Sequence, residues 1–185
     1  METIKIKHYL SPAGEMIIGS AGDRLCLCDW LAGIHRAAID RKIQKRLNAL
    51  YEDGTSDIIK RTAAELDEYF AGRRKTFDIP TVFTGTAFQN TVWTELTSIP
   101  YGTTISYAEL AGRIHNPKAV RAVAAANTVN PISIIVPCHR VIGSDNSLTG
   151  YGGGLYVKKK LLEMENAWKN KNRETAADGL PVICK

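Results

Sequence analysis

Residues 105–127, ISYAELAGRIHNPKAVRAVAAAN, are the most informative part of the sequence for the fold of the second half of this chain. They predict two short helices, over residues 106–114 and 117–126, that are joined by a tight turn. Ser106 and Glu109 have the spacing of a capping box, and Asn116-Pro117 supplies an N-cap followed by a first-turn proline. Such a pair is a candidate helix-turn-helix, but ordinary helical packing explains it equally well. The stretch alone leaves DNA binding and a purely structural role open.

The segment that follows places a cysteine in a chemically informative setting. Residues 132–136 are apolar and predict a buried strand, and Pro137-Cys138-His139-Arg140 comes directly after it. A lone cysteine is usually a small buried apolar residue, but cationic neighbours lower the pKa of a thiol and favour the nucleophilic thiolate. Adjacent residues of an extended chain point to opposite sides. We therefore expect a bridging water, not direct contact, between Cys138 and His139.

A final helix adds an acidic residue that faces inward. Its apolar side chains form one stripe, made of Val157, Leu161, Met164 and Trp168. Glu165 lies beside this stripe, so its carboxylate needs a partner. A histidine would satisfy the carboxylate and would be held in the tautomer that accepts a proton. A peripheral Glu165 paired with Lys158 or with solvent fits the spacing equally well.

The first half of the chain predicts a small α/β region. Strand patterns cover residues 3–8, 15–20 and 24–31, and helical patterns cover residues 40–51 and 56–71. A new helix, over residues 88–97, follows a break at Thr84-Gly85-Thr86. We expect an N-terminal α/β domain, residues 1–83, with a three-stranded antiparallel sheet. A mostly helical, winged-helix-like domain, residues 84–185, follows it.

Composition and charge narrow the class of protein. The chain has 185 residues, 44% of them hydrophobic, and a net charge of +5. Residues 84–185 contain eleven Lys and Arg against seven Asp and Glu. This excess is compatible with a polyanionic partner such as DNA, although on charge alone a solvated surface is the more common explanation. No apolar run of about 18 residues and no apolar leader occurs, so we expect neither a membrane span nor export. The expected location is the cytosol, or the nucleus if the source is a eukaryote.

The four cysteines give no sign of a disulfide framework or a metal site. They lie at positions 26, 28, 138 and 184, and a cytosolic chain would keep them reduced. Cys26 and Cys28 have poor ligand spacing within a strand, and His8 and His35 complete no recognisable zinc site. We expect no metal and no other cofactor.

Several motifs together resemble the O6-alkylguanine-DNA alkyltransferase family. They are ISYAELA (105–111), NPKAVRAVAAAN (116–127), NPISIIVPCHR (130–140), VPCHRVIG (136–143), TGYGGGL (149–155) and the glutamate of the last helix. Their order and spacing cover nearly all of residues 86–166. The first half is similar more loosely, through SPAGEM (11–16) and LDEYFAGRRKTFDIP (66–80). The resemblance implies an α/β domain followed by an alkyltransferase domain with a helix-turn-helix.

The activity that the resemblance implies is direct reversal of DNA damage. A methyl or larger alkyl group moves from O6 of guanine, and from O4 of thymine, to Cys138, irreversibly and once per molecule. By the same resemblance, His139, Glu165 and a water take the thiol proton, and Asn130 braces the turn that carries Cys138. Tyr107 contacts the DNA backbone and donates its hydroxyl toward the base.

The resemblance also implies how the chain binds its substrate. Double-stranded DNA is contacted through the minor groove, and the damaged base is rotated out of the stack into a pocket. The DNA contacts implied are Arg121, Tyr107, Ala122, Ala125, Ala126 and Asn116, with Ala124 also keeping the second helix slim. The pocket residues implied are Tyr151, Gly152, Gly153, Val141 and Lys158. Gly152 departs from members that carry a serine there, so only its backbone amide could make that contact.

Two other functions fit part of the sequence. A cysteine hydrolase would also use Cys and His, but its histidine comes from a distant position in the sequence and not from the neighbouring residue. An alkyltransferase-like protein that binds lesions without reacting lacks the cysteine that this chain has at position 138. We expect a monomer in solution, with clustering on DNA left open.

Overall fold

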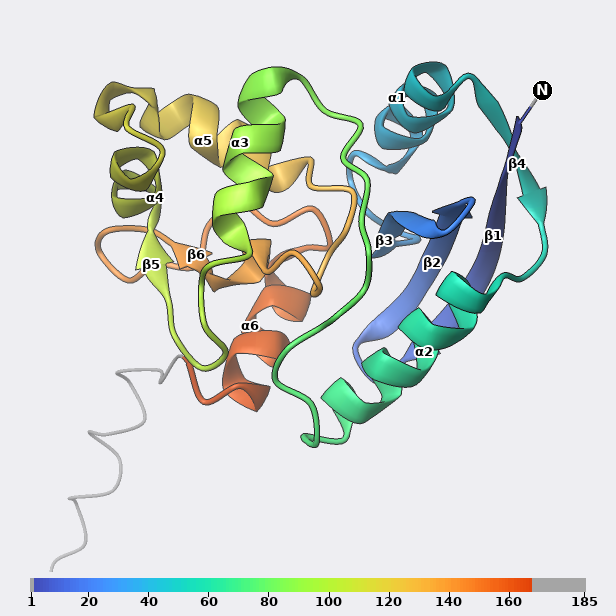
Figure 1. Cartoon of the computed structure of the whole chain (residues 1–185). Helices are drawn as coiled ribbons and strands as arrows, with labels where there is room; N and C mark the ends of the chain where they lie inside the picture. Colours follow the sequence, from blue (N-terminus) through green and yellow to red (C-terminus); the bar gives the residue numbers. More distant parts are fainter. Residues whose placement is uncertain (1, 168–185) are drawn as a thin grey trace, which may run out of the picture.

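A computed structural model describes residues 2–167, so the predicted stripe residue Trp168 and Cys184 lie outside the described part. The N-terminal region contains β1 (Glu2–Ser11), β2 (Gly14–Ala21), β3 (Arg24–Trp30), α1 (Arg36–Leu47), β4 (Ala49–Asp53) and α2 (Asp57–Phe70). The C-terminal region contains α3 (Ala87–Leu96), β5 (Ile105–Ser106), α4 (Tyr107–Arg113), α5 (Val120–Thr128), β6 (Val141–Ile142) and α6 (Leu155–Met164). Two 3-10 turns, η1 (Pro117–Ala119) and η2 (Cys138–Arg140), complete it. Figure 1 shows the two regions side by side.

The N-terminal sheet has four strands in the order β3-β2-β1-β4. β1 with β2 and β2 with β3 pair antiparallel, which confirms the three predicted strands. The fourth strand is a correction, because β4 pairs parallel to β1 and makes the sheet mixed. The predicted helix over residues 40–51 is shifted: α1 begins at Arg36, and Asn48 ends it with a left-handed φ of 47°. The chain then turns into β4.

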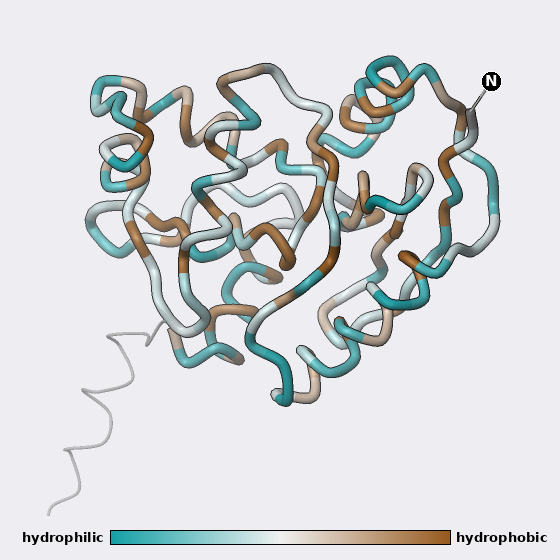
Figure 2. Tube along the Cα trace, viewed as in Figure 1, coloured by the Kyte–Doolittle hydropathy of each residue, from teal (hydrophilic) through white to brown (hydrophobic). Residues whose placement is uncertain are grey.

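Apolar residues of the sheet belong to two buried clusters, one on each face. Figure 2 shows hydrophobic residues distributed along the trace of the sheet. The smaller cluster lies under α1 and includes Ile4, Ile17, Cys26, Ile39 and Ile43. The larger cluster joins the other face of the sheet and α2 to the C-terminal region, and includes Met16, Cys28, Leu66, Tyr69, Trp93, Leu96, Ile132 and Leu161. The two regions therefore share one hydrophobic core, whose burial stabilises each against the other.

The outer edge of β3 is covered by the segment that leads to Cys138. The backbone N–H of Cys28 donates to Pro131 (2.9 Å), and the N–H of Ser133 donates to Cys28 (2.6 Å). The prediction of a strand over residues 132–136 is nevertheless wrong, since only an isolated bridge joins Cys28 to Ile132. Ile134 has a φ of 72°, which is unfavourable for a β-branched residue, and the chain turns back on itself there. The segment is buried as a turn and not as a strand.

The helix-turn-helix follows the prediction with small changes. The Ser106 hydroxyl accepts the N–H of Glu109 (3.0 Å), but the Glu109 carboxylate pairs with Arg113 (2.7 Å) and does not complete a capping box. Pro117 opens η1, while Asn116 makes no side-chain cap. β5 and β6 form a short parallel pair beside α4. Figure 1 shows α4 and α5 on the side of the molecule away from β1 and β4.

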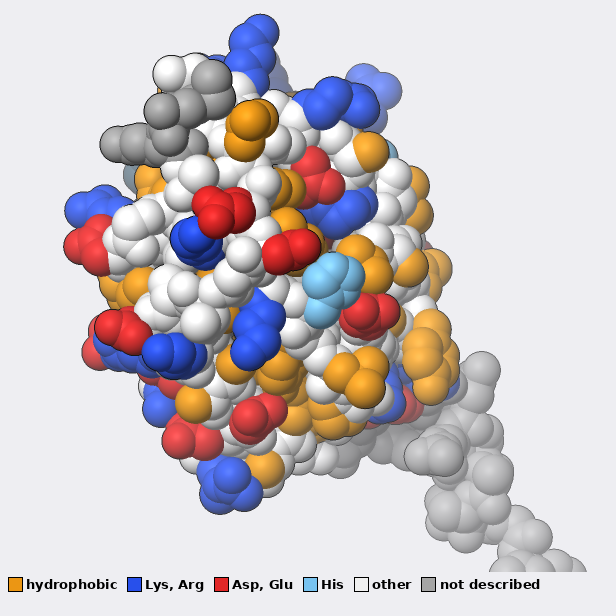
Figure 3. Space-filling view, turned by 90° about the vertical axis from the view of Figure 1, so that its right-hand side faces the viewer, with side chains coloured by type: hydrophobic (Ala, Val, Ile, Leu, Met, Phe, Trp, Pro, Cys, Tyr) orange, Lys and Arg blue, Asp and Glu red, His pale blue; other side chains and the backbone are white. Residues whose placement is uncertain are grey.

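The N-terminal side of the molecule carries charges of both signs. Figure 3 shows Lys and Arg side chains interspersed with Asp and Glu over this face. Lys5 pairs with Glu52 (2.8 Å) and Arg61 with Asp78 (3.1 Å), both near the surface. Such exposed pairs stabilise the fold little, because solvent and salt screen their charges. Within residues 2–167, no helix has the length and apolar character needed to span a bilayer.

Candidate active site

Cys138 begins the 3-10 turn η2, and the Asn130 side chain braces the segment before it. The Asn130 amide donates to the carbonyl oxygens of Val136 (2.9 Å) and Ile132 (3.3 Å), and its own oxygen accepts the N–H of Ile132 (3.0 Å). The Asn127 amide donates to the carbonyl oxygen of Cys138 (3.1 Å). These bonds close the turn and explain why the unfavourable Ile134 backbone is tolerated.

The thiol of Cys138 is buried and protonated at neutral pH. Its exposed fraction is 2%, and burial raises its pKa to about 11, although a hydrogen bond from Asn130 and the charge of Lys158 act in the opposite direction. The expectation that Cys138 and His139 lie on an extended chain is wrong, because both belong to η2. A base must therefore take the proton before or during any attack by sulfur.

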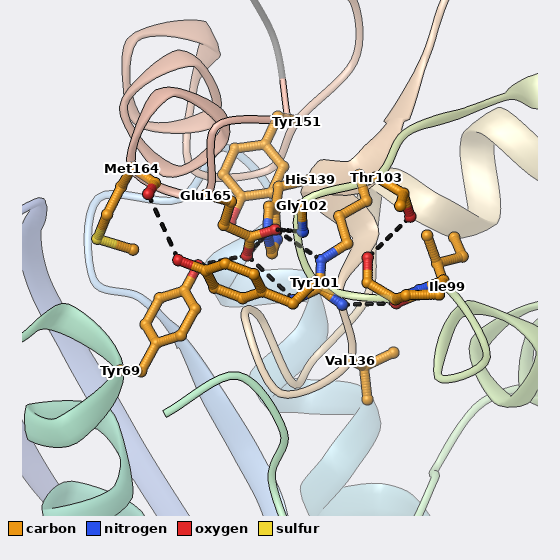
Figure 4. A network of polar contacts seen from close by, with 12 residues as sticks. Tyr69, Ile99, Tyr101, Gly102, Thr103, Val136, His139, Tyr151, Met164 and Glu165 are labelled. Carbon is orange, nitrogen blue, oxygen red and sulfur yellow. Dashed lines mark hydrogen bonds and ion pairs between the residues drawn. The ribbon is translucent and has the colours of Figure 1, made fainter. Parts of the chain in front are cut away.

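His139, the next residue in the chain, is the candidate for that base. It is fully buried, and its Nε2 lies 2.8 Å from Oε1 of Glu165 (Figure 4). Its Nδ1 has no hydrogen-bond partner among residues 2–167. Burial lowers the pKa of His139, and the positive charges of Arg140 and Lys158 lower it further, against the opposing effect of Glu165. The imidazole is thus neutral at rest.

Glu165 is the centre of the buried network. Its Oε1 accepts Tyr69 Oη (2.7 Å) and Arg140 Nη2 (3.1 Å) in addition to His139. Its Oε2 accepts Arg140 Nε (2.9 Å) and the N–H of Gly102 (3.2 Å). Burial alone would raise the pKa of Glu165, but the hydrogen bonds and charges of His139 and Arg140 hold it well below its usual range. The carboxylate stays ionised.

This ionised carboxylate settles which nitrogen of His139 carries the proton. Oε1 of Glu165 can only accept, so Nε2 of the neutral ring must donate to it. Nδ1 then holds a lone pair that is free to accept a proton. The alternative pairing of Glu165 with Lys158 is wrong, since Lys158 bonds elsewhere.

Lys158 and Tyr107 hold the loop that follows β6. The buried Lys158 Nζ donates to the carbonyl oxygens of Val141 (2.5 Å) and Thr149 (2.6 Å). The Tyr107 hydroxyl lies 3.0 Å from the carbonyl oxygens of both Thr149 and Gly150, so its single proton serves one of them at a time. Burial lowers the pKa of Lys158 to about 8 and raises that of Tyr107 to about 12. Tyr107 is therefore a neutral donor.

The same loop packs against the N-terminal region through Trp30. Trp30 Nε1 donates to the hydroxyl of Tyr151 (2.9 Å), and both rings are buried. A Cβ at Gly153 would lie 2.2 Å from the Trp30 ring, so no side chain fits there. A Cβ at Gly152 would lie 2.8 Å from the carbonyl oxygen of Thr128, which explains why a serine does not fit here without movement.

The outer face of α5 presents a basic side chain on a slim helix. Arg121, Ala122 and Ala125 are exposed, Ala124 is partly buried, and Asn116 is exposed ahead of η1. Ala126 departs from the expected placement: it is 3% exposed, and its carbonyl oxygen accepts Trp93 Nε1 (2.9 Å), so it faces the core. Tyr107 is 8% exposed and points to the loop rather than to this face.

Two family profiles match this chain. The "6-O-methylguanine DNA methyltransferase, ribonuclease-like domain" matches residues 4–83, and the "6-O-methylguanine DNA methyltransferase, DNA binding domain" matches residues 87–167. A methylated-DNA--protein-cysteine methyltransferase of Haemophilus influenzae is 40% identical, over 89% of this chain and 88% of its own length. One from Methanosarcina barkeri is 51% identical, over 84% of this chain and 92% of its own. The chain belongs to the 6-O-methylguanine DNA methyltransferase family.

Solved structures agree with this assignment to the methyltransferase family. Mycobacterium tuberculosis OGT in complex with DNA superposes with a TM-score of 0.75 and 40% identity, over 88% of this chain and 92% of the other. The O6-methylguanine-DNA methyltransferase of Pyrococcus kodakaraensis superposes with a TM-score of 0.63 and 25% identity, over 89% of this chain and 100% of the other. The predicted fold class is confirmed.

Three residues of this methyltransferase site were not found from the sequence. The sequence indicates Arg140 only as a cation near the thiol, whereas in the structure it makes the ion pair with Glu165. Tyr69 and Trp30 come from the N-terminal region, and their partners lie 96 and 121 positions away in the chain. The one available signal was the looser family match over residues 66–80, which contains Tyr69.

Proposed function

We propose that this chain repairs O6-alkylguanine in DNA by moving the alkyl group to Sγ of Cys138, once per molecule. The observation that carries the proposal is the arrangement of buried thiol, free Nδ1 of His139 and ionised Glu165, in a member of this methyltransferase family. Double-stranded DNA is the partner, in keeping with the matched DNA-binding domain and the relative solved with DNA.

The proposed reaction is an in-line displacement at the alkyl carbon. The sulfur–carbon bond forms as the carbon–O6 bond breaks, and the electron pair leaves with guanine. The thiol proton passes to Nδ1 of His139, directly or through a water, and Glu165 stabilises the imidazolium. The Tyr107 hydroxyl donates a hydrogen bond to the guanine ring, which requires it to exchange a loop carbonyl for the base. The thioether product is not reversed by thiols, so no turnover follows.

The proposed base pocket lies between the loop and η2. Tyr151, Gly152 and Gly153 close over the base, while Lys158 and the carbonyl of Val141 fix the start of the loop. Because Cys138 is only 2% exposed, the loop must move for a base to enter. The lack of side chains at residues 152 and 153 then allows the backbone to approach the base closely.

The proposed DNA surface is the outer face of α5. Ala122 and Ala125 allow the helix to lie close to the minor groove, Asn116 contacts the backbone, and Arg121 fills the gap left by the extruded base. Ala126 supports this helix from the core side.

We further propose a domain boundary near residue 84, a cytosolic location, and a monomer that does not need a partner subunit for transfer.

The proposal is tested by the mass of the intact protein after incubation with duplex DNA that contains O6-methylguanine. We expect a gain of about 14 Da, one methyl in place of one hydrogen, mapped to Cys138. The Cys138→Ser variant should bind the DNA and gain no mass. Binding without any mass gain by the wild-type chain would favour the lesion-binding alternative. A gain at Cys26 or Cys28 would contradict the assignment of the acceptor.

A further inference from the structure

One hydrogen-bond donor to Glu165 comes from the N-terminal region. Tyr69 lies in the last turn of α2 and is fully buried, and its hydroxyl donates to Oε1 of Glu165 at 2.7 Å (Figure 4). Its ring packs against Phe70, Phe77 and Tyr101. A phenylalanine would serve that packing equally well. The hydroxyl therefore requires its own explanation, and the proposed alkyl transfer does not use it.

The hydroxyl competes with the histidine for one carboxylate oxygen. Tyr69 and His139 Nε2 both bond Oε1 of Glu165, at 2.7 and 2.8 Å. Arg140 and the backbone of Gly102 already hold Oε2, so the position of the carboxylate does not depend on Tyr69 alone. A carboxylate oxygen that accepts several donors has less negative charge to offer to each of them. Tyr69 thus weakens the support that Glu165 gives to a protonated His139.

We propose that Tyr69 is a positioning residue of the proton relay, which limits the basicity of His139 and so adds to the effect of burial in keeping Cys138 a protonated thiol in the resting protein. A resting thiol resists oxidation and unspecific alkylation better than a thiolate does. This inference rests on the proposed function, because a protected thiol is useful only if Cys138 is the acceptor of the alkyl group. The effect of Tyr69 on His139 is independent of that transfer and is measured separately.

Tyr69 itself remains a donor across the working pH range. Burial, and then the charge of Glu165, raise its pKa well above the usual value. The other ionisable groups that face this network are Arg140 and Cys138 on η2, Lys158 on α6, Tyr101 in the turn before β5, Tyr151 in the loop and Asp29 on β3. Arg140 and Lys158 also disfavour a charge on His139. Because Tyr69 itself does not titrate in this range, any change in the pH dependence of Cys138 reactivity after removal of the Tyr69 hydroxyl is due to His139.

The test is Tyr69→Phe, with histidines labelled with nitrogen-15 and titrated by NMR. We expect the pKa of His139 to rise by about half a unit, and iodoacetamide to react with Cys138 about threefold faster near neutral pH. The His139→Phe variant identifies the His139 signals. Tyr9→Phe is the matched control, because Tyr9 donates to Asp67 on the same helix α2 (2.8 Å), outside the network. It should leave both readings unchanged.

A second variant at position 69 should shift the pKa of His139 in the opposite direction. It distinguishes an effect of the hydrogen bond from an effect of disturbed packing. Site-specific 3-fluorotyrosine at position 69 keeps the ring and strengthens the donor, so the pKa of His139 should fall. An unchanged or lowered pKa in Tyr69→Phe, or a shift of the same sign in both proteins, would overturn the inference. Neither measurement uses DNA. A failure of alkyl transfer with the expected histidine shifts would contradict the proposed function and leave this inference standing.

Discussion

The proposed proton relay around Glu165 and the outer face of α5 differ in how their polar side chains are partnered. Glu165 accepts hydrogen bonds from four residues, and His139 is fully buried beside it. Arg121 on α5 is exposed and has no hydrogen bond or ion pair within residues 2–167. The carboxylate of Glu165 has its hydrogen-bond donors in place before any substrate binds, whereas the α5 face has its polar group still available for a partner.

This difference gives the two regions separate experimental signatures. A change in the relay should slow transfer from any substrate, because it acts on the sulfur and its proton. A change on α5 should slow transfer only from duplex DNA, because only a base within a duplex must be rotated out. The free base O6-benzylguanine reaches the pocket without DNA, so the ratio of the two rates separates the regions.

The largest effect is expected from Glu165→Gln. The substitution keeps the shape of the side chain but removes the charge that stabilises a protonated His139, so transfer should slow by about 100-fold near neutral pH. The factor should be similar for O6-methylguanine duplex and for free O6-benzylguanine in single-turnover measurements. A loss restricted to the duplex would show that Glu165 serves DNA binding and would remove the distinction between the regions.

A smaller and substrate-specific effect is expected from Arg121→Ala. Transfer from duplex DNA should slow by about tenfold, since an unfilled gap in the stack favours return of the base. Transfer from free O6-benzylguanine should change less than about twofold. Arg41→Ala, an exposed arginine on α1, is the matched control for lost positive charge. Equal losses on both substrates would place Arg121 in the pocket and not on the DNA surface.

The two regions also differ in how well the sequence predicts them. The α4–α5 pair follows from local signals such as the Ser106 cap and Pro117, which act within a few residues. Helical spacing leaves an inward and a peripheral Glu165 equally open, and the structure shows the inward one, with 2% exposure. Its partners Arg140 and Tyr69 could not be predicted, because residues 25 and 96 positions apart meet only in the tertiary fold.

Two predicted secondary-structure elements differ from the structure for local reasons that the pattern of hydrophobic residues does not show. Residues 132–136 have the apolar character of a strand, but the Asn130 side chain takes the place of a strand partner and closes a turn. Asn48 adopts the left-handed conformation and ends α1 before β4, although the apolar spacing continues past it. A side-chain hydrogen bond decides the backbone path at Asn130, whereas at Asn48 the left-handed conformation that asparagine tolerates ends the helix.

We propose that Cys138 reacts because His139, supported by Glu165, takes its proton. The most direct test is the rate of transfer to O6-benzylguanine against pH for wild type, Glu165→Gln, His139→Phe and the double variant. The lowered pKa of His139 means that the base form is kept as pH falls to about 6.5, so the wild-type rate should be level above that pH. Without the relay the rate should rise with pH toward the raised pKa of Cys138, about 11. The double variant should lose less than the product of the single losses. A Glu165→Gln profile with the wild-type shape, or fully multiplicative losses, would contradict the relay.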